Sequence, residues 1–394
     1  MNTILNLGEH PLVNRLIEKK DLKKKDYYFP LILKRCKSCS LIQLSQYVDP
    51  KNLYTDEDYK YFSSDVSAQV KYFKRYSLEL KKRFLRKKSF VVEIGSNDGI
   101  MLKHFVKNHI VLGVDPATNV VLRSLKRNVN SIANFFSKKI SSKILNEYGK
   151  SDLIIANNCM AHTNDLKDLI QGIENLISKK GVFIAEFNYW GSMVKNNNYS
   201  LIYHEHYSFF SLSVWENFLK KFKLKIFDAL ITDAQGGSLR IYCSLNKRRK
   251  TKRFKEILNS EKIDKINSIS AADKFKKNVR YLSKKLKKIT YNLKSNGKRI
   301  ACYGAAAKGM TILKCSEIDE RIIDYFIDDS PAKQNLYSAG DHIPILSRKK
   351  IKEKLPDYFI ISAPNFADNI IKKEKKFAAD GGKFIIPSKD IIIK

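Results

Sequence analysis

The sequence predicts an α/β protein with two parallel sheets, each covered by helices, and a small irregular module at the N-terminus. Three observations predict this class. Apolar runs alternate with amphipathic segments in the middle of the chain and again near its end. The first run of each series leads into a glycine turn, at Gly95 and at Gly304. The chain has 394 residues, of which 43% are hydrophobic, so it can bury more than one core.

We divide the chain into an irregular module at 1–65, a larger α/β domain at 66–250, basic linker helices at 251–296 and a smaller α/β domain at 297–394. Each predicted strand is a short apolar run, and each predicted helix has apolar residues at a spacing of three or four. In the larger domain, strands are expected at 90–94, 110–116, 131–136, 151–158 and 182–189, followed by β-rich pieces at 224–232 and 236–245. Helices are expected at 66–88, 100–108, 122–128, 165–181 with Gly181 as its C-cap, and 214–222. In the smaller domain, 298–309 reads as strand, turn and helix start, and further strands are expected within 322–329, 357–364 and 383–387.

The linker contains one long apolar stripe, which begins at Phe275 and ends at Leu293. Its members recur every three or four residues, which indicates one face of a long helix. We expect this helix to pack across both domains. A coiled-coil dimer seam is the alternative interpretation.

Composition restricts the partners. The net charge is +34, from 74 basic and 40 acidic side chains, which suggests nucleic acid at first sight. The excess of lysine fits solvated faces better, and it suits a substrate with phosphate groups. No run approaches a membrane span of roughly 18 apolar residues, and no signal peptide is recognisable at the N-terminus. We therefore expect a cytoplasmic protein without a membrane or nucleic-acid partner, as a monomer or homodimer.

The glycine turn after the first strand predicts a cofactor site. Glu93 lies near the end of that strand, and 95–99 read Gly-Ser-Asn-Asp-Gly. Glycines let the backbone approach a ligand, and amides at a helix start point at it. Asp115, about 20 residues further on, is placed to bond a ribose hydroxyl. This layout alone suits either a nicotinamide or S-adenosylmethionine, but the G-x-G-x-x-G spacing is missing, and Glu93 with Asn157 and Asn158 favours S-adenosylmethionine.

A series of motifs then resembles known families. EIGSNDG, VLGVDPA, ANFF and LIIANNCMAH resemble the successive motifs of class I S-adenosylmethionine-dependent methyltransferases. YHEHYSFFS, GGSLRIY, YGAAAKG and APNFADNI narrow the resemblance to the sugar C-methyltransferases that act on nucleotide-linked 4-keto-deoxysugars. The resemblance covers nearly the whole chain. It implies a zinc-binding N-terminal module, a class I methyltransferase domain and a Rossmann-like C-terminal domain.

The resemblance also implies a mechanism, in which a base removes the proton next to the sugar's keto group and the enolate receives the methyl. His206 matches that base; an unperturbed histidine titrates near pH ~6.5 and is partly neutral at working pH. Tyr203 can donate to the developing oxyanion, and Glu205 can orient the histidine or bond a sugar hydroxyl. Tyr61 is expected to enter the active site, although loop packing would also explain this tyrosine. The other implied residues are Glu93, Gly95, Asn97, Asp115, Phe135, Asn157 and Asn158 for the cofactor, and Tyr59, His162 and Lys308 for the substrate, with Lys308 at a diphosphate.

The sequence offers few candidate metal ligands. The family's zinc module carries two C-x-x-C pairs, and this chain has only Cys36 and Cys39, with His10 as a possible third ligand. Structural zinc takes four protein ligands, so we expect no complete site. His204 and His206 would share one face if their segment were a strand, which leaves a metal at this motif as an alternative, beside purely structural histidines.

Other functions remain open. A base-methylating enzyme would carry an N/D-P-P-Y/F motif after the fourth strand, where this chain reads Asn-Asn-Cys-Met at 157–160. A small-molecule O- or N-methyltransferase of the same fold could use the same histidine. A nucleotide-sugar binding protein without catalysis is the third alternative, and the intact Tyr-His-Glu-His stretch argues against it.

Overall fold

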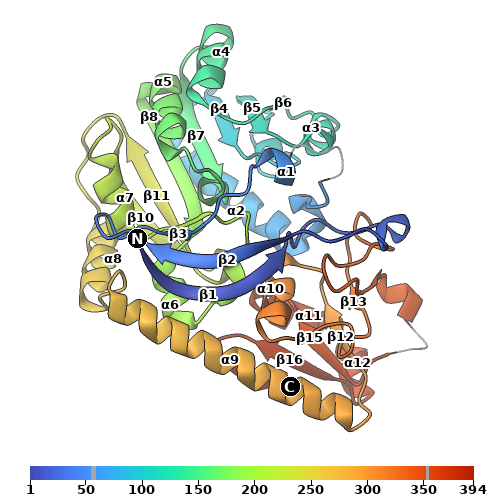
Figure 1. The fold of residues 1–394 in the computed structure, drawn as a ribbon. Coiled ribbons are helices and arrows are strands. Elements are labelled where there is room, and N and C mark those ends of the chain that lie inside the picture. Colours follow the sequence, from blue (N-terminus) through green and yellow to red (C-terminus); the bar gives the residue numbers. More distant parts are fainter. Residues whose placement is uncertain (55–58, 352–354) are drawn as a thin grey trace.

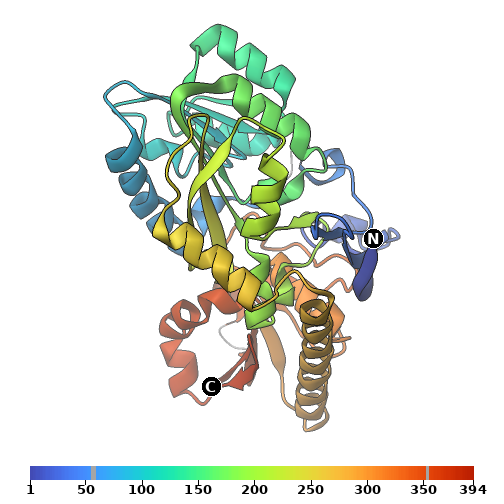
Figure 2. The same ribbon diagram turned by 90° about the vertical axis from the view of Figure 1, so that its left-hand side faces the viewer.

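Three sheets organise the chain in the computed structural model, which describes residues 1–54, 59–351 and 355–394. Two of them belong to α/β units that lie one above the other in Figure 2. The third is a small antiparallel sheet near the N-terminus (Figure 1). Within the described residues, every helix is too short or too polar to cross a membrane.

The largest sheet has seven strands in the order β10-β11-β8-β7-β4-β5-β6. The five strands from β8 to β6 run parallel, whereas β11 pairs antiparallel with β8, and β10 with β11. The predicted α/β class is confirmed here, because the apolar runs form central strands that are buried on both faces. The strands are β4 (Phe90–Ile94), β5 (Ile110–Asp115), β6 (Ser131–Ala133), β7 (Ser151–Asn157), β8 (Ile177–Asn188), β10 (Lys225–Thr232) and β11 (Ser238–Ser244).

Two predicted helix features around this sheet are wrong. Residues 100–108 form turns and one 3₁₀ turn, η3 (Leu102–His104), instead of an α-helix. Gly181 caps no helix, because α5 ends at Leu176 and Gly181 lies inside β8. The helices of this unit are α2 (Ser67–Phe84), α3 (Thr118–Leu125), α4 (Lys138–Tyr148), α5 (Leu166–Leu176), α6 (Trp190–Asn196) and α7 (Leu212–Leu219).

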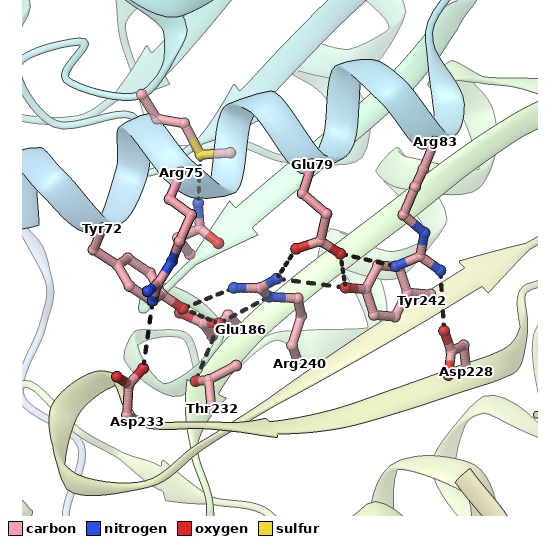
Figure 3. A network of polar contacts seen from close by, with 12 residues as sticks. Tyr72, Arg75, Glu79, Arg83, Glu186, Asp228, Thr232, Asp233, Arg240 and Tyr242 are labelled. Carbon is pink, nitrogen blue, oxygen red and sulfur yellow. Dashed lines mark hydrogen bonds and ion pairs between the residues drawn. The ribbon is translucent and has the colours of Figure 1, made fainter. Parts of the chain in front are cut away.

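A buried polar network holds α2 on this sheet (Figure 3). Arg240 on β11 donates to the Glu186 carboxylate on β8 across 2.9 Å, and it also binds Glu79 and the Tyr72 hydroxyl on α2. Glu186 in turn accepts from Tyr72 at 2.6 and 2.7 Å. Ion pairs out of water need such additional hydrogen bonds to be tolerated. The network fixes how α2 lies across the strands, and the N-terminal turn of α2 faces the cavity described below.

The N-terminal module is more regular than predicted. β1 (Asn2–Pro11), β2 (Tyr28–Arg35) and β3 (Ile42–Leu44) form an antiparallel sheet with β9 (Ser208–Phe209), which follows the Tyr-His-Glu-His stretch. Leu31 and Leu33 are fully buried, so the apolar alternation of β2 faces a core. The helix α1 (Lys51–Tyr54) follows. Because β9 completes this sheet, the module is attached directly to the loop that carries His206.

The linker forms two helices, α8 (Lys252–Ile263) and α9 (Ile269–Ser295). α9 runs along one side of the molecule toward the C-terminal unit (Figure 1) and contacts β1, α6 and β17. Phe275, Val279, Leu282 and Leu286 are buried in these contacts, as expected for a helix that packs across domains. The same burial removes the stripe from solvent, so the coiled-coil interpretation is wrong.

The C-terminal sheet has the order β14-β13-β12-β15-β16-β17, with β12 to β16 parallel and β17 antiparallel. In chain order the strands lie 3-2-1-4-5-6, which is the order of a doubly wound nucleotide-binding sheet. The second predicted Rossmann-like unit is confirmed in this respect. Its elements are β12 (Ile300–Tyr303), α10 (Ala307–Cys315), β13 (Phe326–Ile327), β14 (Ile345–Leu346), β15 (Tyr358–Ile361), α11 (Ala367–Lys373), α12 (Lys375–Ala379), β16 (Lys383–Pro387) and β17 (Ile391–Ile393).

Candidate active site

One cavity of about 970 Å³ lies between the carboxyl ends of the two parallel sheets. Glu93, Asp115 and Asn157 line it from the larger sheet, and Gly304 and Asp328 from the smaller one. Open α/β sheets bind ligands at this edge because strands end there and helix N-termini point toward it. Each residue that the sequence predicts for catalysis, cofactor or substrate lines this cavity; their roles stay predictions.

His206 lines the cavity, and its ring is held in a defined orientation. Its Nδ1 lies 2.7 Å from the carbonyl oxygen of Leu201, which accepts the Nδ1 proton. Nε2 is therefore the unprotonated nitrogen, and the Tyr203 hydroxyl donates to it across 3.1 Å. Burial, and secondarily His162, lowers the pKa of His206 well below its usual value. The imidazole is thus neutral at neutral pH, and not partly protonated as the sequence suggested.

Glu205 points into the same cavity but does not orient His206. Its Oε1 accepts from the side-chain amide of Asn14, at 2.5 Å, which reaches in from the N-terminal module. Burial raises the pKa of Glu205 to about 7. The ring of His206 is held by Leu201 and Tyr203, so of the two expected roles of Glu205 only contact with a bound ligand is compatible with this arrangement.

Aromatic side chains from the N-terminal module line the cavity. The ring of Tyr54 stacks on His162, with ring centroids 5.6 Å apart, and its hydroxyl lies 3.1 Å from His162 Nδ1. The ring of His162 lies 5.2 Å from that of His206, and burial lowers its pKa to about 4. Tyr61 accepts at 2.6 Å from the Gln69 amide on the first turn of α2. Tyr59 lies edge-on to Tyr54, with centroids 5.6 Å apart.

The predicted cofactor side has buried polar atoms without a partner among the described residues: Glu93 Oε2, Ser96 Oγ, Asn157 Oδ1 and Asn158 Oδ1. Such atoms are costly unless a ligand or water satisfies them. Burial raises the pKa of Glu93 to about 8. Gly95 has φ +66, and a Cβ there would lie 2.7 Å from Cys159 Cβ, so only glycine fits this turn. The residues present fit a cofactor with amino and hydroxyl groups.

Asp115 and Asn97 are tied to the backbone around the turn. Asp115 accepts from the amides of Asn97, at 2.9 Å, and Ala117, at 3.1 Å, and a carboxylate keeps further acceptor capacity beyond these two bonds. Burial raises the pKa of Asp115 to about 6. The Asn97 side chain instead bonds the amide of Ser63 and the carbonyl of Tyr61. Asn97 therefore fastens the segment with the two predicted tyrosines over the turn.

His204 and the cysteines do not build a metal site. His204 turns away from the cavity, with its Nε2 3.2 Å from the carbonyl of Phe29, because its segment is a turn and not a strand. His10 lies against Cys315, 4.0 Å away, instead of joining the Cys36 and Cys39 knuckle. Among the described residues, no cluster of three or more histidine, cysteine or acidic side chains could hold a metal ion. Residues 1–54, 59–351 and 355–394 therefore do not supply the four ligands of a structural zinc site.

We accordingly expect the purified protein to hold less than one zinc per chain. Two thiolates leave two coordination positions to water, so binding is weak, and dialysis against a chelator should remove the metal. Elemental analysis before and after dialysis checks this. One zinc per chain that survives the chelator would contradict the prediction and require ligands from elsewhere, such as a second copy.

The sequence analysis did not single out several residues in and beside the cavity. Asn14 and Gln69 hold the predicted Glu205 and Tyr61, and the Asn188 amide nitrogen lies 3.4 Å from His206 Nε2. Gln235 and Asn365 bind Lys308. Two of them had a signal in the sequence: Gln235 directly precedes the Gly236-Gly237 pair, and Asn365 lies within the APNFADNI motif.

Family models match almost the whole chain in three consecutive parts. Residues 68–228 match a methyltransferase domain, and residues 233–388 match the C-methyltransferase C-terminal domain. Residues 1–54 match a model described as "Putative zinc binding domain". A curated relative, the C-methyltransferase NovU of Streptomyces niveus, is 28% identical over 388 residues, which cover 98% of this chain and 92% of that protein.

Solved methyltransferase structures match just under half of this chain. A S-adenosylmethionine-dependent methyltransferase from Clostridium acetobutylicum covers 47% of this chain and 94% of its own, at 15% identity and a TM-score of 0.36. Magnesium protoporphyrin IX methyltransferase from Synechocystis covers 46% of this chain and 85% of its own, at 13% identity and a TM-score of 0.36. The three consecutive domain matches and the full-length similarity to a C-methyltransferase place this chain in the family of S-adenosylmethionine-dependent C-methyltransferases.

Proposed function

We propose that this enzyme methylates the carbon next to the keto group of a nucleotide-linked 4-keto-deoxysugar, with His206 as the general base. The observation that carries the proposal is the neutral, buried imidazole of His206. Its Nε2 faces a large cavity between the parallel sheets of the two Rossmann-like units. The motif resemblance supports the sugar class. The size of the cavity leaves room for a cofactor and a nucleotide-linked sugar together.

His206 performs the proton transfer in this proposal. The C–H bond next to the ketone breaks, its electron pair enters the enolate, and the proton moves to Nε2. The Nδ1 hydrogen bond to Leu201 keeps Nε2 unprotonated beforehand and aligns the ring. Because burial lowers the pKa of His206, the resulting imidazolium loses its proton readily after turnover.

Tyr203 stabilises the enolate oxygen. Its hydroxyl donates to His206 Nε2 when no substrate is present and can turn to the ketone oxygen when Nε2 receives the substrate's proton. Tyr61, Tyr59 and His162 enclose the sugar, and Glu205 accepts from one of its hydroxyls. Lys308 binds the phosphate side of the substrate.

The cofactor lies at the glycine turn in this proposal. S-adenosylmethionine, when bound, supplies an electrophilic methyl group. Glu93, Asn157 and Asn158 offer the unpaired polar atoms for its amino-acid part, and Asp115 accepts from its ribose. Gly95 gives the backbone close approach, and Asn97 and Phe135 complete the lining.

We predict that Asp115→Ala weakens S-adenosylmethionine binding by about ten- to a hundredfold. A hydrogen bond to a charged group contributes about 1.5–3 kcal/mol, and about 1.4 kcal/mol is tenfold in affinity. Calorimetric titration measures the dissociation constant. Asp152→Ala is the matched control, because Asp152 also accepts from a backbone amide, that of Phe90, but at the opposite end of the sheet. Equal affinities of wild type and Asp115→Ala would remove Asp115 from the cofactor site.

Solvent deuterium exchange tests the proposed reaction. The enzyme is incubated in deuterated buffer with dTDP-, CDP- and GDP-linked 4-keto-deoxysugars and S-adenosylhomocysteine, and the α-carbon is followed by NMR. A C-methyltransferase should wash deuterium into that carbon faster than buffer alone, whereas an O- or N-methyltransferase or a binding protein should not. With S-adenosylmethionine, the new methyl should appear on the exchanging carbon. Methyl transfer to oxygen or nitrogen without exchange would refute the proposal.

A further inference from the structure

Lys308 is a buried cation that has no counter-ion among the residues that the structure describes. It is the second residue of α10, and only 9% of it is exposed. Its Nζ donates to Gln235 Oε1 at 2.5 Å and to Asn365 Oδ1 at 3.1 Å, and both acceptors are neutral amides. Within the described part of the chain, Lys308 forms no ion pair, whereas the neighbouring Lys333 lies 3.6 Å from Asp328. Burial lowers the pKa of Lys308 to about 7.

The two acceptors come from different α/β units. Gln235 belongs to the loop between β10 and β11 of the larger sheet, and Asn365 follows β15 of the smaller one. Gln235 has φ 55° and ψ 14°, a left-handed conformation that is rare for a residue with a side chain. Gly236 and Gly237 follow with φ of 86° and 121°. Strained backbone of this kind persists where the surroundings impose it, and it often lies at ligand sites.

This geometry leaves one donor free for a ligand. A lysine ammonium has three N–H donors, and the two amide oxygens accept two of them. Neutral acceptors orient the ammonium but do not compensate its charge, so desolvation remains costly until an anion arrives. Lys308 lines the same cavity as His206, and its charge contributes to the low pKa of that histidine. The anion would therefore bind within the active-site cavity.

We propose that Lys308, Gln235 and Asn365 form an anion subsite for a phosphate group, in which Gln235 and Asn365 are positioning residues. The inference deepens the proposed function, on which it rests for the identity of the substrate. Gln235 and Asn365 direct the third N–H of Lys308 at the phosphate and leave its positive charge uncompensated. Binding also joins the two α/β units, because the phosphate is held through residues of both.

Calorimetric titration with inorganic pyrophosphate at pH 6.5 tests the subsite, because Lys308 is largely protonated there. Lys308→Met should weaken pyrophosphate binding at least about tenfold, the usual loss for a charge-assisted hydrogen bond. Gln235→Glu should weaken it by a similar factor, because a carboxylate in the same place would neutralise the ammonium. Gln235→Met removes one acceptor without adding charge and should have the smaller effect. Lys314→Met is the matched control, since Lys314 lies on the same helix and pairs with Asp341.

Two outcomes would overturn the proposal. One is the absence of saturable pyrophosphate binding to the wild-type protein. The other is unchanged binding in Lys308→Met together with loss in Lys333→Met, which would place the anion at Lys333. Unchanged S-adenosylmethionine affinity in each variant excludes misfolding as the cause of a loss. The titration needs no turnover, so it can be read separately from the deuterium exchange of the wild-type enzyme. If Lys308→Met loses pyrophosphate binding but the wild type catalyses no exchange, the proposed function alone is refuted. If the wild type catalyses exchange but Lys308→Met binds pyrophosphate normally, the subsite alone is refuted.

Discussion

Replacing His206 by alanine is expected to lower turnover by at least about a hundredfold, because a positioned general base contributes about 10²–10⁴ to the rate. The variant loses the unprotonated ring nitrogen that accepts from Tyr203. The predicted cofactor residues lie at the end of other strands, so S-adenosylmethionine affinity should stay unchanged. Initial rates of methyl transfer and calorimetric titration of the cofactor measure the two quantities separately.

His204→Ala is the matched control for this experiment. His204 lies two residues earlier in the same turn, but its ring bonds the carbonyl of Phe29 and points away from the cavity. Its loss should therefore leave the rate within a few-fold of wild type. Added imidazole should partly restore His206→Ala, because it can occupy the vacated space as a base. Near-normal turnover of His206→Ala, or an equal loss in both variants, would contradict the proposed base.

The predicted fold agrees with the structure where burial alone determines the element. The runs at Phe90–Ile94 and Ser151–Asn157 are apolar on both faces, and such runs form central parallel strands. The helix predicted at 100–108 is wrong for a related reason. Ile100, Met101, Leu102 and Phe105 have helical spacing and are all buried, yet they form turns that pack against the sheet. Spacing indicates which residues face the core, and it does not by itself distinguish a helix from a packed loop.

The candidate site was predictable where local motifs place residues at strand ends. Glu93, Asp115 and Asn157 follow from the glycine turn and the ends of neighbouring strands, and the cavity contains all three. Partners supplied across long chain separations were not predictable. Asn14 binds Glu205 over 191 residues, and Gln235 binds Lys308 over 73. Such pairs depend on how the three sheets pack against one another, and a single sequence contains no pattern that predicts this packing.

The buried network of Figure 3 makes Arg240 the residue with the largest expected effect on stability. Arg240→Met should lower the free energy of unfolding by about 3–5 kcal/mol, since removing one partner leaves a charge buried without compensation. The Glu186 side chain has no exposed surface, and its remaining partners, Tyr72 and Thr232, are neutral hydroxyls. Urea titration followed by circular dichroism measures the change. Arg75→Met is the control, because Arg75 and its partner Asp233 are both largely exposed, and loss of an exposed ion pair should cost no more than about 1 kcal/mol.

A second substitution separates the loss of charge balance from the loss of packing. Arg240→Met combined with Glu186→Gln removes both charges, and an amide can still accept from the Tyr72 hydroxyl. The double variant should therefore regain more than half of the stability that Arg240→Met loses, as expected when an unpaired buried charge is the main cost. If the double variant is as unstable as the single one, the contribution of Arg240 comes from its stacking on the Tyr76 ring, 3.3 Å from the ring centroid. In that case α2 is held on the sheet by the arginine's packing and not by its ion pair.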